Sequence, residues 1–441
     1  MHAMKLRIRR LRAGSCALIT ALALCWGAAI PAATLHVSQC GDSGAGSLRD
    51  AVASAGDGDT IEVSAAGCGA IPLNSPIVVN QANLTLQSAT PIALDAQGNG
   101  RVLEHRGAGT LRLSRLHLMH GRIKDAALAS GGCLHSEGRV ELDRLTVSGC
   151  AAIADGPGAL ALGGGVHAVS VHGHRLQLLD NRAVGEDSHG GGVSTEGRTY
   201  LLYSRVAGNH ARTGGGIFSL GGVSLIYARV EHNAAYDNAG IQTSGHVVTV
   251  NKSSITANRA VRRCGGICAS DRPQDFSRII NSTISGNEAR YLAAGEFTAG
   301  VRLENSTIAF NRDRSTQVCV GAFRAAQLAL ISTILANNRC DGPAPAYDVG
   351  GRAWEGDAIV GTHSLIQHSR LALPPDTLSV DPRLDPQAAL NGGSHSLVHA
   401  LLPDSPAIDR GFDAIDGQYD QRGPGFPRVK GVQADIGAFE R

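Results

Sequence analysis

The segments SSITAN (253–258), STISGN (282–287), STIAFN (306–311) and STILAN (332–337) repeat one pattern of small polar residues, an aliphatic residue and a closing asparagine. Looser copies end at residues 121, 150, 181, 209 and 233, so the pattern recurs every 24 to 31 residues. Between the copies lie glycine clusters and short alternating apolar runs, which are typical of strands joined by turns. A repeat of this length predicts a solenoid.

Two solenoid folds have repeats of about this length. Leucine-rich repeats need leucine at fixed positions before the asparagine, whereas this chain often has serine five positions before it. The glycine clusters fit no leucine-rich repeat either. The sequence therefore predicts an all-β fold, a right-handed parallel β-helix with three strands per coil and about nine regular coils.

The repeated asparagines have a structural explanation. An asparagine amide has both donors and an acceptor for equivalent residues in the coils above and below, and asparagine tolerates the left-handed conformation of a tight corner. Seven catalytic or ligand-binding asparagines at this regular spacing would be an implausible alternative. We expect one ladder formed by Asn181, Asn209, Asn233, Asn258, Asn287, Asn311 and Asn337.

The first 33 residues have the parts of a secretory signal. Basic residues from Lys5 to Arg12 are followed by an apolar run over about residues 17–29 and then by small residues. We therefore expect an exported protein, either extracellular or periplasmic.

Eight cysteines follow the predicted signal, and an even number in an exported chain favours disulfides. Cys264 and Cys268 could instead suggest a metal site, but no second cysteine pair follows at zinc-like spacing. Sequential pairing is the simplest arrangement of the eight, which are Cys40, Cys68, Cys133, Cys150, Cys264, Cys268, Cys319 and Cys340.

The composition excludes several classes of protein. The 441 residues include 40 lysines and arginines against 38 aspartates and glutamates, a balance that argues against nucleic-acid binding. A hydrophobic content of 43 % argues against disorder. No segment after the signal is apolar enough to span a bilayer. We expect a monomer with no integral membrane segment and no nucleic-acid partner.

Both ends of the predicted mature chain carry distinctive motifs. The start contains DSGAGSLRDA (42–51), and the end contains NGG (391–393), SPAIDRG (405–411), DQRG (420–423) and DIGAFE (435–440). With the STIxxN-type coils, these motifs resemble the choice-of-anchor Q domain family of bacterial exported right-handed β-helix proteins. The coils are more loosely similar to polymorphic outer-membrane proteins and to the pectate-lyase-like fold.

The resemblance implies four parts. They are a signal peptide (1–33), a segment leading into the first coils (34–115), the β-helix repeats (116–340) and a C-terminal cap region (341–441). Members of the family commonly continue into a surface-anchoring tail, and this chain ends directly after its last motif. We therefore expect no C-terminal anchor. The resemblance supplies no catalytic residues.

The charged residues of the end motifs suggest a cap. An open β-helix end exposes unpaired backbone groups, so terminal coils must differ from internal ones. We expect charge-assisted hydrogen bonds to tie the final coils, formed by residues that include Asp409, Asp420, Arg422 and Asp435. The alternative is a calcium site at Asp413, Asp416 and Asp420, although no Asp-x-Asp-x-Asp loop is present. No other cofactor is expected.

Two classes of function remain. The first is a rigid binding or adhesive surface for a polysaccharide, a host protein or another cell-surface or envelope component. The second is a polysaccharide lyase or glycoside hydrolase of pectate-lyase-like fold. No catalytic residue stands out: Asp180, Glu186 and Asp187 are close in sequence but lack partners in adjacent coils, and the run at 120–124 matches polygalacturonase fragments by chance. His167, His172 and His174 could form a metal patch, although exposed strand histidines are the commoner explanation. The first class is favoured.

Overall fold

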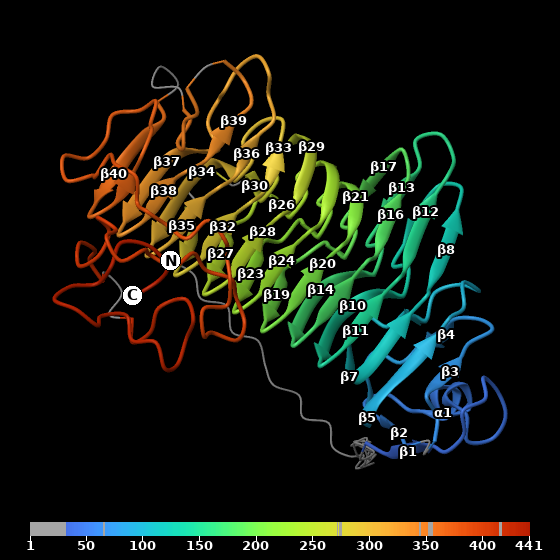
Figure 1. The fold of residues 1–441 in the computed structure, drawn as a ribbon. Coiled ribbons are helices and arrows are strands. Elements are labelled where there is room, and N and C mark those ends of the chain that lie inside the picture. The colour runs from blue at the N-terminus through green and yellow to red at the C-terminus, as the bar shows by residue number, and fades with distance from the viewer. Residues whose placement is uncertain are drawn as a thin grey trace, which may run out of the picture. The chain divides into compact units, whose positions relative to one another are not determined.

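The structure is a computed structural model that describes residues 32–64, 67–270, 272, 276–343, 345–351, 356–413 and 417–441. These residues form an all-β parallel solenoid of about 12 turns with one short helix (Figure 1), which confirms the predicted fold class. The prediction of about nine coils counted only those with the repeat motif, and the first coils of the solenoid lack that motif. Of the predicted signal peptide, residues 1–31 lie outside the described residues.

Each strand pairs in parallel with the strand one turn further along the chain, so equivalent strands form rows along the axis. Row 1 consists of β1 (Thr34–Val37), β2 (Thr60–Val63), β5 (Leu84–Asp95), β7 (Thr110–Met119), β10 (Leu134–Asp143), β14 (Val166–His174), β19 (Thr199–Leu202), β23 (Val223–Ile226), β27 (Val248–Asn251), β31 (Phe276–Ile280), β34 (Gly295–Glu304), β37 (Phe323–Ile331) and β40 (Ala358–Thr362). Row 2 contains β3 (Ala70–Pro72), the ends of β5 and β7, β11 (Thr146–Ser148), β15 (Gln177–Leu179), β20 (Arg205–Ala207), β24 (Arg229–Glu231), β28 (Ser254–Thr256), β32 (Thr283–Ser285), β35 (Thr307–Ala309), β38 (Ile334–Ala336) and β41 (Leu365–Ile366).

Two further rows close the coils. Row 3 contains β4 (Ile77–Val79), β6 (Leu103–His105), the starts of β10, β14, β34 and β37, β18 (Val193–Thr195), β22 (Ile217–Ser219), β26 (Ile241–Ser244) and β30 (Ile267–Ser270). Row 4 is a second sheet with β8 (Arg122–Asp125), β9 (Leu128–Ser130), β12 (Ala151–Ala154), β13 (Leu160–Leu162), β16 (Arg182–Val184), β17 (Asp187–His189), β21 (His210–Thr213), β25 (Ala234–Asp237), β29 (Arg259–Arg263), β33 (Glu288–Ala289), β36 (Arg312–Asp313) and β39 (Arg339–Cys340).

The helix α1 (Leu48–Ser54) packs against the first strands at the N-terminal end of the solenoid. Ser47 caps it by accepting a hydrogen bond from the backbone N–H of Asp50, and Leu48, Ala51 and Val52 are buried. The Gln81 amide donates to the carbonyl oxygen of Val52 near the other end of the helix. The segment 42–51 therefore starts a helical cover over the first coil.

Stacked aliphatic residues fill the interior. Alternate residues of a strand face the same side, so the aliphatic residue of each repeat points inward. Val206, Val230, Ile255, Ile284 and Ile308 pair in register in row 2, and each is at most 1 % exposed. This column is the core that the periodicity predicts.

A middle coil has four short strands rather than three, as β22, β23, β24 and β25 show. Tyr227, with φ of 51°, separates the strands of rows 1 and 2, and His232, with φ of 55°, separates those of rows 2 and 4. A left-handed residue turns the chain sharply, so each such corner ends one strand and begins another.

Six of the seven predicted ladder asparagines lie in one continuous ladder at the corner between rows 2 and 4. The Oδ1 atom of Asn233, for example, accepts hydrogen bonds from the backbone N–H and from Nδ2 of Asn209, both at 3.0 Å. Asn233 Nδ2 donates onward to Asn258 and to the carbonyl oxygen of Val206 at 2.9 Å. Both ends of each amide are therefore satisfied.

The seventh ladder position belongs to Asn338, and the prediction of Asn337 is wrong. Asn311 Nδ2 donates to Asn338 Oδ1 at 2.9 Å, because Leu335 rather than Ile334 pairs with Ile308. The residue before each ladder asparagine has a positive φ, and Asn337, with φ of 57°, takes that place. The left-handed corner thus belongs to the preceding residue and not to the ladder asparagine.

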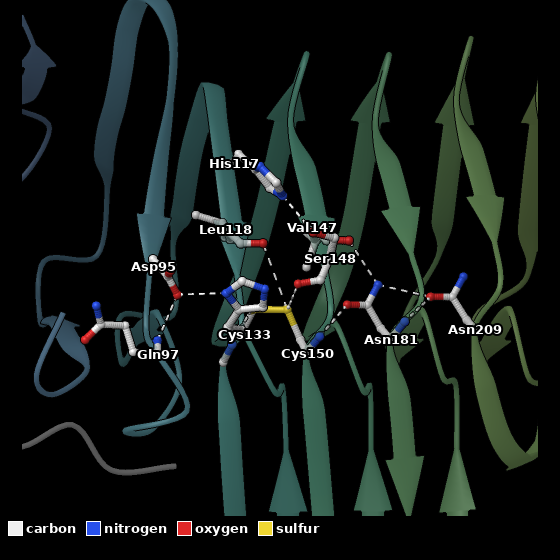
Figure 2. The surroundings of a disulfide bond; sticks show 12 residues. Asp95, Gln97, His117, Leu118, Cys133, Val147, Ser148, Cys150, Asn181 and Asn209 are labelled. Atoms are coloured by element: carbon white, nitrogen blue, oxygen red, sulfur yellow. Dashed lines mark hydrogen bonds and ion pairs between the residues drawn. A yellow bond between two sulfur atoms is a disulfide. The ribbon is translucent and has the colours of Figure 1, made fainter. Parts of the chain in front are cut away.

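The ladder has a different group at each end. At one end the backbone N–H of Cys150 donates to Asn181 Oδ1 at 3.0 Å, and Cys150 is bonded to Cys133 (Figure 2). At the other end Asn338 Nδ2 donates to the carboxylate of Asp348 at 2.8 Å. The amides donate toward Asp348, so the carboxylate lies at the positive end of the aligned dipoles.

All eight predicted cysteines form disulfides in sequential order, with Cα–Cα distances of 5.5 to 5.9 Å. The pairs are Cys40–Cys68, Cys133–Cys150, Cys264–Cys268 and Cys319–Cys340.

The C-terminal segment from about residue 379 folds back along row 2 and does not cover the end of the solenoid. Ser285 Oγ lies 2.6 Å from His399 Nε2, Thr283 Oγ1 donates to Gln421 Oε1 at 2.7 Å, and Thr307 Oγ1 accepts from the backbone N–H of Ala438. In Figure 1 the red segment runs beside the orange and yellow coils. The serines and threonines of the repeat motif therefore form the docking face for this segment, which we call the tail (379–441).

The charged residues predicted as a cap hold the tail's own loops together. Arg422 Nη2 lies 2.6 Å from Asp420 Oδ2, in a pair that is almost fully buried. The backbone N–H of Asp409 donates to Asp435 Oδ1 at 2.8 Å. The predicted hydrogen bonds are present, but they stabilise a lateral strap rather than a terminal cap.

Candidate functional site

The outward side chains of row 1 line a groove of about 440 Å³ that crosses successive coils from β5 to β19. Strand register stacks Arg112, Glu141, His172 and Tyr200 in one column. A second column two residues further along each strand contains Ser114, Asp143, His174 and Leu202. Alternation directs both columns outward, while the residues between them fill the core. We call this surface the row 1 groove.

Guanidinium groups hold Glu141 from both sides. Arg112 Nε lies 2.9 Å from Glu141 Oε2, and Arg139 Nη2 lies 3.0 Å from Oε1. Arg139 Nη2 also donates to His172 Nδ1 at 2.9 Å, so His172 must be neutral with its proton on Nε2. Burial and the nearby Arg139 charge lower the pKa of His172, in agreement with this arrangement.

Rings line the end of the groove nearest β19. His172 and Tyr200 have ring centroids 5.5 Å apart, and His174 meets Tyr203 edge-on at 6.1 Å. His174 Nδ1 also lies 2.6 Å from Asp143 Oδ1. Planar rings beside fixed polar groups can contact the apolar faces and the hydroxyl groups of a sugar.

Three arginines lie directly next to the groove strands in the chain, and we call them the rim. Arg144 and Arg175 occupy left-handed corners one coil apart, with φ of 48° and 53°. Both are exposed, as is Arg198 in the turn before β19. Among the described residues, none of these three guanidinium groups has a carboxylate partner. The rim therefore displays positive charge that the solenoid does not neutralise.

The tail borders the same groove. His395 packs against Tyr203 and Tyr227, with ring centroids 4.6 and 5.8 Å away, and the two tyrosines stack at 5.0 Å. Burial and the charges of Arg175 and Arg229 lower the pKa of His395. A loop more than 150 residues distant in the sequence thus contributes to one side of the site.

The three histidines considered as a metal patch do not lie together in the structure. His172 and His174 share the outward face of row 1, as expected for residues two apart, but His167 lies in row 3 beside His135. Burial lowers the pKa of His167 to about 4. The three residues therefore do not form one metal site.

The acidic residues considered as candidates lie elsewhere. Asp187 pairs with His189, and Glu186 accepts from the backbone N–H of Gly158. The calcium alternative includes Asp416, which lies outside the described residues; Asp420 is paired with Arg422, and Asp413 accepts from Asn305 Nδ2 at 3.3 Å.

One cluster of metal-ligating atoms is present among the described residues. The sulfurs of Cys264 and Cys268 and a carboxylate oxygen of Glu296 lie within 4.8 Å of one another. The sulfurs are bonded to each other, and Glu296 pairs with Arg263 and Arg324. In this state the cluster offers no free ligand set.

The groove residues carry a weak sequence signal. Arg112, Glu141, His172 and Tyr200 are the second or third residues of short alternating runs, and they align only when whole coils are superimposed. Their spacing varies with the length of the turns, so they form no pattern at a fixed distance from the repeated asparagines.

No family model matches the chain, and no curated protein matches it, so the resemblance to the choice-of-anchor Q family stays a prediction. Among solved structures, the crystal structure of pectate lyase Pel9A aligns with a TM-score of 0.44 and 11 % sequence identity, covering 93 % of this chain and 98 % of that one. The helix in the described part is too short to span a membrane.

Proposed function

We propose that the protein is an exported polysaccharide-binding solenoid whose row 1 groove takes an acidic chain lying along the axis. The observation that carries this proposal is the groove itself, in which four successive coils present Arg112, Glu141, His172 and Tyr200 in register. Neighbouring coils are about 4.8 Å apart, comparable to one sugar residue, so successive coils can contact successive sugars.

The charge of the rim favours an acidic polysaccharide over a neutral one. Arg144, Arg175 and Arg198 lack carboxylate partners among the described residues, and a guanidinium group binds a carboxylate through two parallel hydrogen bonds. In contrast, the acids on the floor already have partners, Glu141 in two guanidinium groups and Asp143 in the His174 ring. Uronate carboxylates would therefore meet the rim, and the sugar rings would meet Tyr200 and His172.

A binding experiment tests this function. Isothermal titration of the purified protein with polygalacturonate, hyaluronan and neutral xylan, with and without calcium, should give binding to one or both acidic chains and none to xylan. Salt should weaken it, because exposed charges are screened. Tyr200→Ala and the double variant Arg144→Gln/Arg175→Gln should each reduce affinity at least about tenfold, equivalent to about 1.4 kcal/mol.

Thr249→Ala is the matched control. Thr249 lies in the same outward column as Tyr200, two coils further along, and outside the groove. This variant should bind like the wild-type protein. Equal binding of neutral and acidic chains, or unchanged affinity in both groove variants, would refute the proposal.

Polysaccharide cleavage is the second candidate, and the pair Glu141 and Asp143 favours it. These acids lie two apart on one strand, so both project into the groove. New reducing ends, or absorbance of an unsaturated uronate, would establish a hydrolase or a lyase. Retention without turnover would support a binding protein.

A further inference from the structure

A second cavity, of about 350 Å³, lies between rows 3 and 4 near the C-terminal end of the solenoid. Its lining includes four arginines, Arg262, Arg263, Arg324 and Arg370, and one acid, Glu296. The arginines come from β29, β37 and the loop after β41, so residues up to about 100 positions apart meet there. It is separate from the row 1 groove and shares no lining residue with it.

The carboxylates around this cavity are already engaged. Glu296 is 3 % exposed and pairs with both Arg263 and Arg324. Arg324 Nε also lies 2.9 Å from Asp357, and Asp237 holds Arg262 through two hydrogen bonds of 2.8 and 2.6 Å. Glu296, Asp357 and Asp237 therefore form ion pairs with three of the four arginines, and Arg370 is the fourth.

Arg370 supplies the unbalanced charge. Its guanidinium group lies 5.4 Å from the ring centre of Tyr347, and among the described residues it has no carboxylate partner. Burial and the neighbouring charges of Arg262 and Arg324 lower the pKa of Arg263, as expected for crowded cations. An anion in the cavity would meet this excess of positive charge at short range.

Three other residues of the lining are less polar. Leu292 is 6 % exposed, and it is joined by Val320 and Tyr291. The volume lies in the range of small-ligand sites and exceeds what a bare oxyanion fills. Several guanidinium forks in one place suit a tetrahedral oxyanion with several acceptor oxygens.

We propose that this arginine pocket binds a phosphate or sulfate monoester, with the oxyanion against Arg262, Arg263 and Arg370 and the organic part against Leu292 and Val320. The shared chemistry is the tetrahedral oxyanion, which could belong to a free ion or to a modified sugar. The inference does not depend on the row 1 groove.

Titration of the whole protein distinguishes these sources. Inorganic phosphate, inorganic sulfate, glucose 6-phosphate and glucose are compared at constant ionic strength by calorimetry, with ³¹P resonances as a direct readout for the phosphates. Both free ions should bind, glucose 6-phosphate should bind more tightly than phosphate, and glucose should not bind. Equal affinity for phosphate and its sugar ester would overturn the organic half of the proposal, and absence of oxyanion binding would overturn all of it.

Two variants test the assigned residues. Arg370→Gln removes an exposed side chain that has no ion pair with any described residue, so the fold should persist, and phosphate affinity should fall at least about tenfold. Arg262→Gln gives a second measurement at another residue assigned to the oxyanion. Arg339→Gln, an exposed arginine of β39 outside the cavity, is the control and should bind normally. Undiminished phosphate binding in both pocket variants, with melting temperatures near that of the wild type, would refute the site.

Discussion

Two adjacent asparagines provide a sharp test of the ladder. Asn338 lies inside it: its Oδ1 accepts from the backbone N–H and from Nδ2 of Asn311, and its Nδ2 donates to Asp348. Asn337 is the preceding corner residue, with φ of 57° and a partly exposed side chain. The side-chain amides of these two neighbouring residues should therefore contribute very differently to the free energy of unfolding.

The magnitude follows from the partners that each substitution leaves behind. Asn338→Ala leaves the buried backbone N–H of Asn311 without its acceptor, whereas Asn311 Nδ2 keeps the carbonyl oxygens of Ile284 and Ala309, so the free energy of unfolding should fall by about 1–3 kcal/mol. It also deprives the Asp348 carboxylate of one donor. Asn337→Gly removes no hydrogen bond from the described structure and keeps the left-handed corner, so the expected loss is about 0–1 kcal/mol.

Equilibrium unfolding in urea measures both variants, and amide hydrogen exchange separates global from local loss. Neighbouring coils stabilise one another, so Asn338→Ala should also weaken protection in β35 and β38 before the distant coils. A loss in Asn337→Gly equal to that in Asn338→Ala, or a loss below about 1 kcal/mol in Asn338→Ala, would show that the ladder register is wrong.

Three further predictions concern the disulfide, the tail and a buried acid. Replacing both Cys133 and Cys150 by serine should lower the free energy of unfolding by about 3 kcal/mol, as expected for a loop of 17 residues, and unchanged stability under non-reducing conditions would contradict this. Arg428→Met should release the tail, because this guanidinium group is 1 % exposed, donates to Asn305 and Ser332 of the solenoid, and is the cation that faces Glu440 of the tail. The expected loss is about 3–5 kcal/mol, visible as early proteolysis after residue 379 with the circular dichroism of the coils retained, and a protease-resistant tail would refute it. Burial raises the pKa of Asp348 to about 6, so the folded state holds this proton more tightly than the unfolded chain. The resulting stability is present below about pH 4 and is lost as pH rises through about 6, so the stability of the wild type relative to Asp348→Asn should fall by about 2–3 kcal/mol over that range, and a difference independent of pH would disprove it.

The features of this protein that depend on local pattern could be predicted from the amino-acid sequence alone. The spaced aliphatic residues and asparagines predict the solenoid, because a column of equivalent side chains requires the same residue type in every coil. Six ladder asparagines follow from the repeat alone. The eight disulfide cysteines also follow from the sequence, but their connectivity does not, and only the structure selects the four sequential pairs.

The register at the last copy needed the tertiary structure. Two asparagines in succession satisfy the same motif, and only the pairing of Leu335 with Ile308 selects Asn338. Sequence spacing could not decide this, because turn lengths vary between coils and a shift of one residue moves every side chain to the opposite face.

The tail and both candidate sites also belong to the tertiary structure. The four strictest copies of the motif lie in the coils that the tail covers, where Thr283 meets Gln421 across 138 residues and Ser254 meets Leu397 across 143. In the sequence, the serines and threonines of these copies are only part of a repeat. In the structure, their hydrogen-bond partners are tail residues that belong to no repeat. The row 1 groove and the arginine pocket arise likewise from side chains of different coils. A local pattern can specify a strand and the face it buries, whereas contacts between distant segments exist only once the coils have stacked.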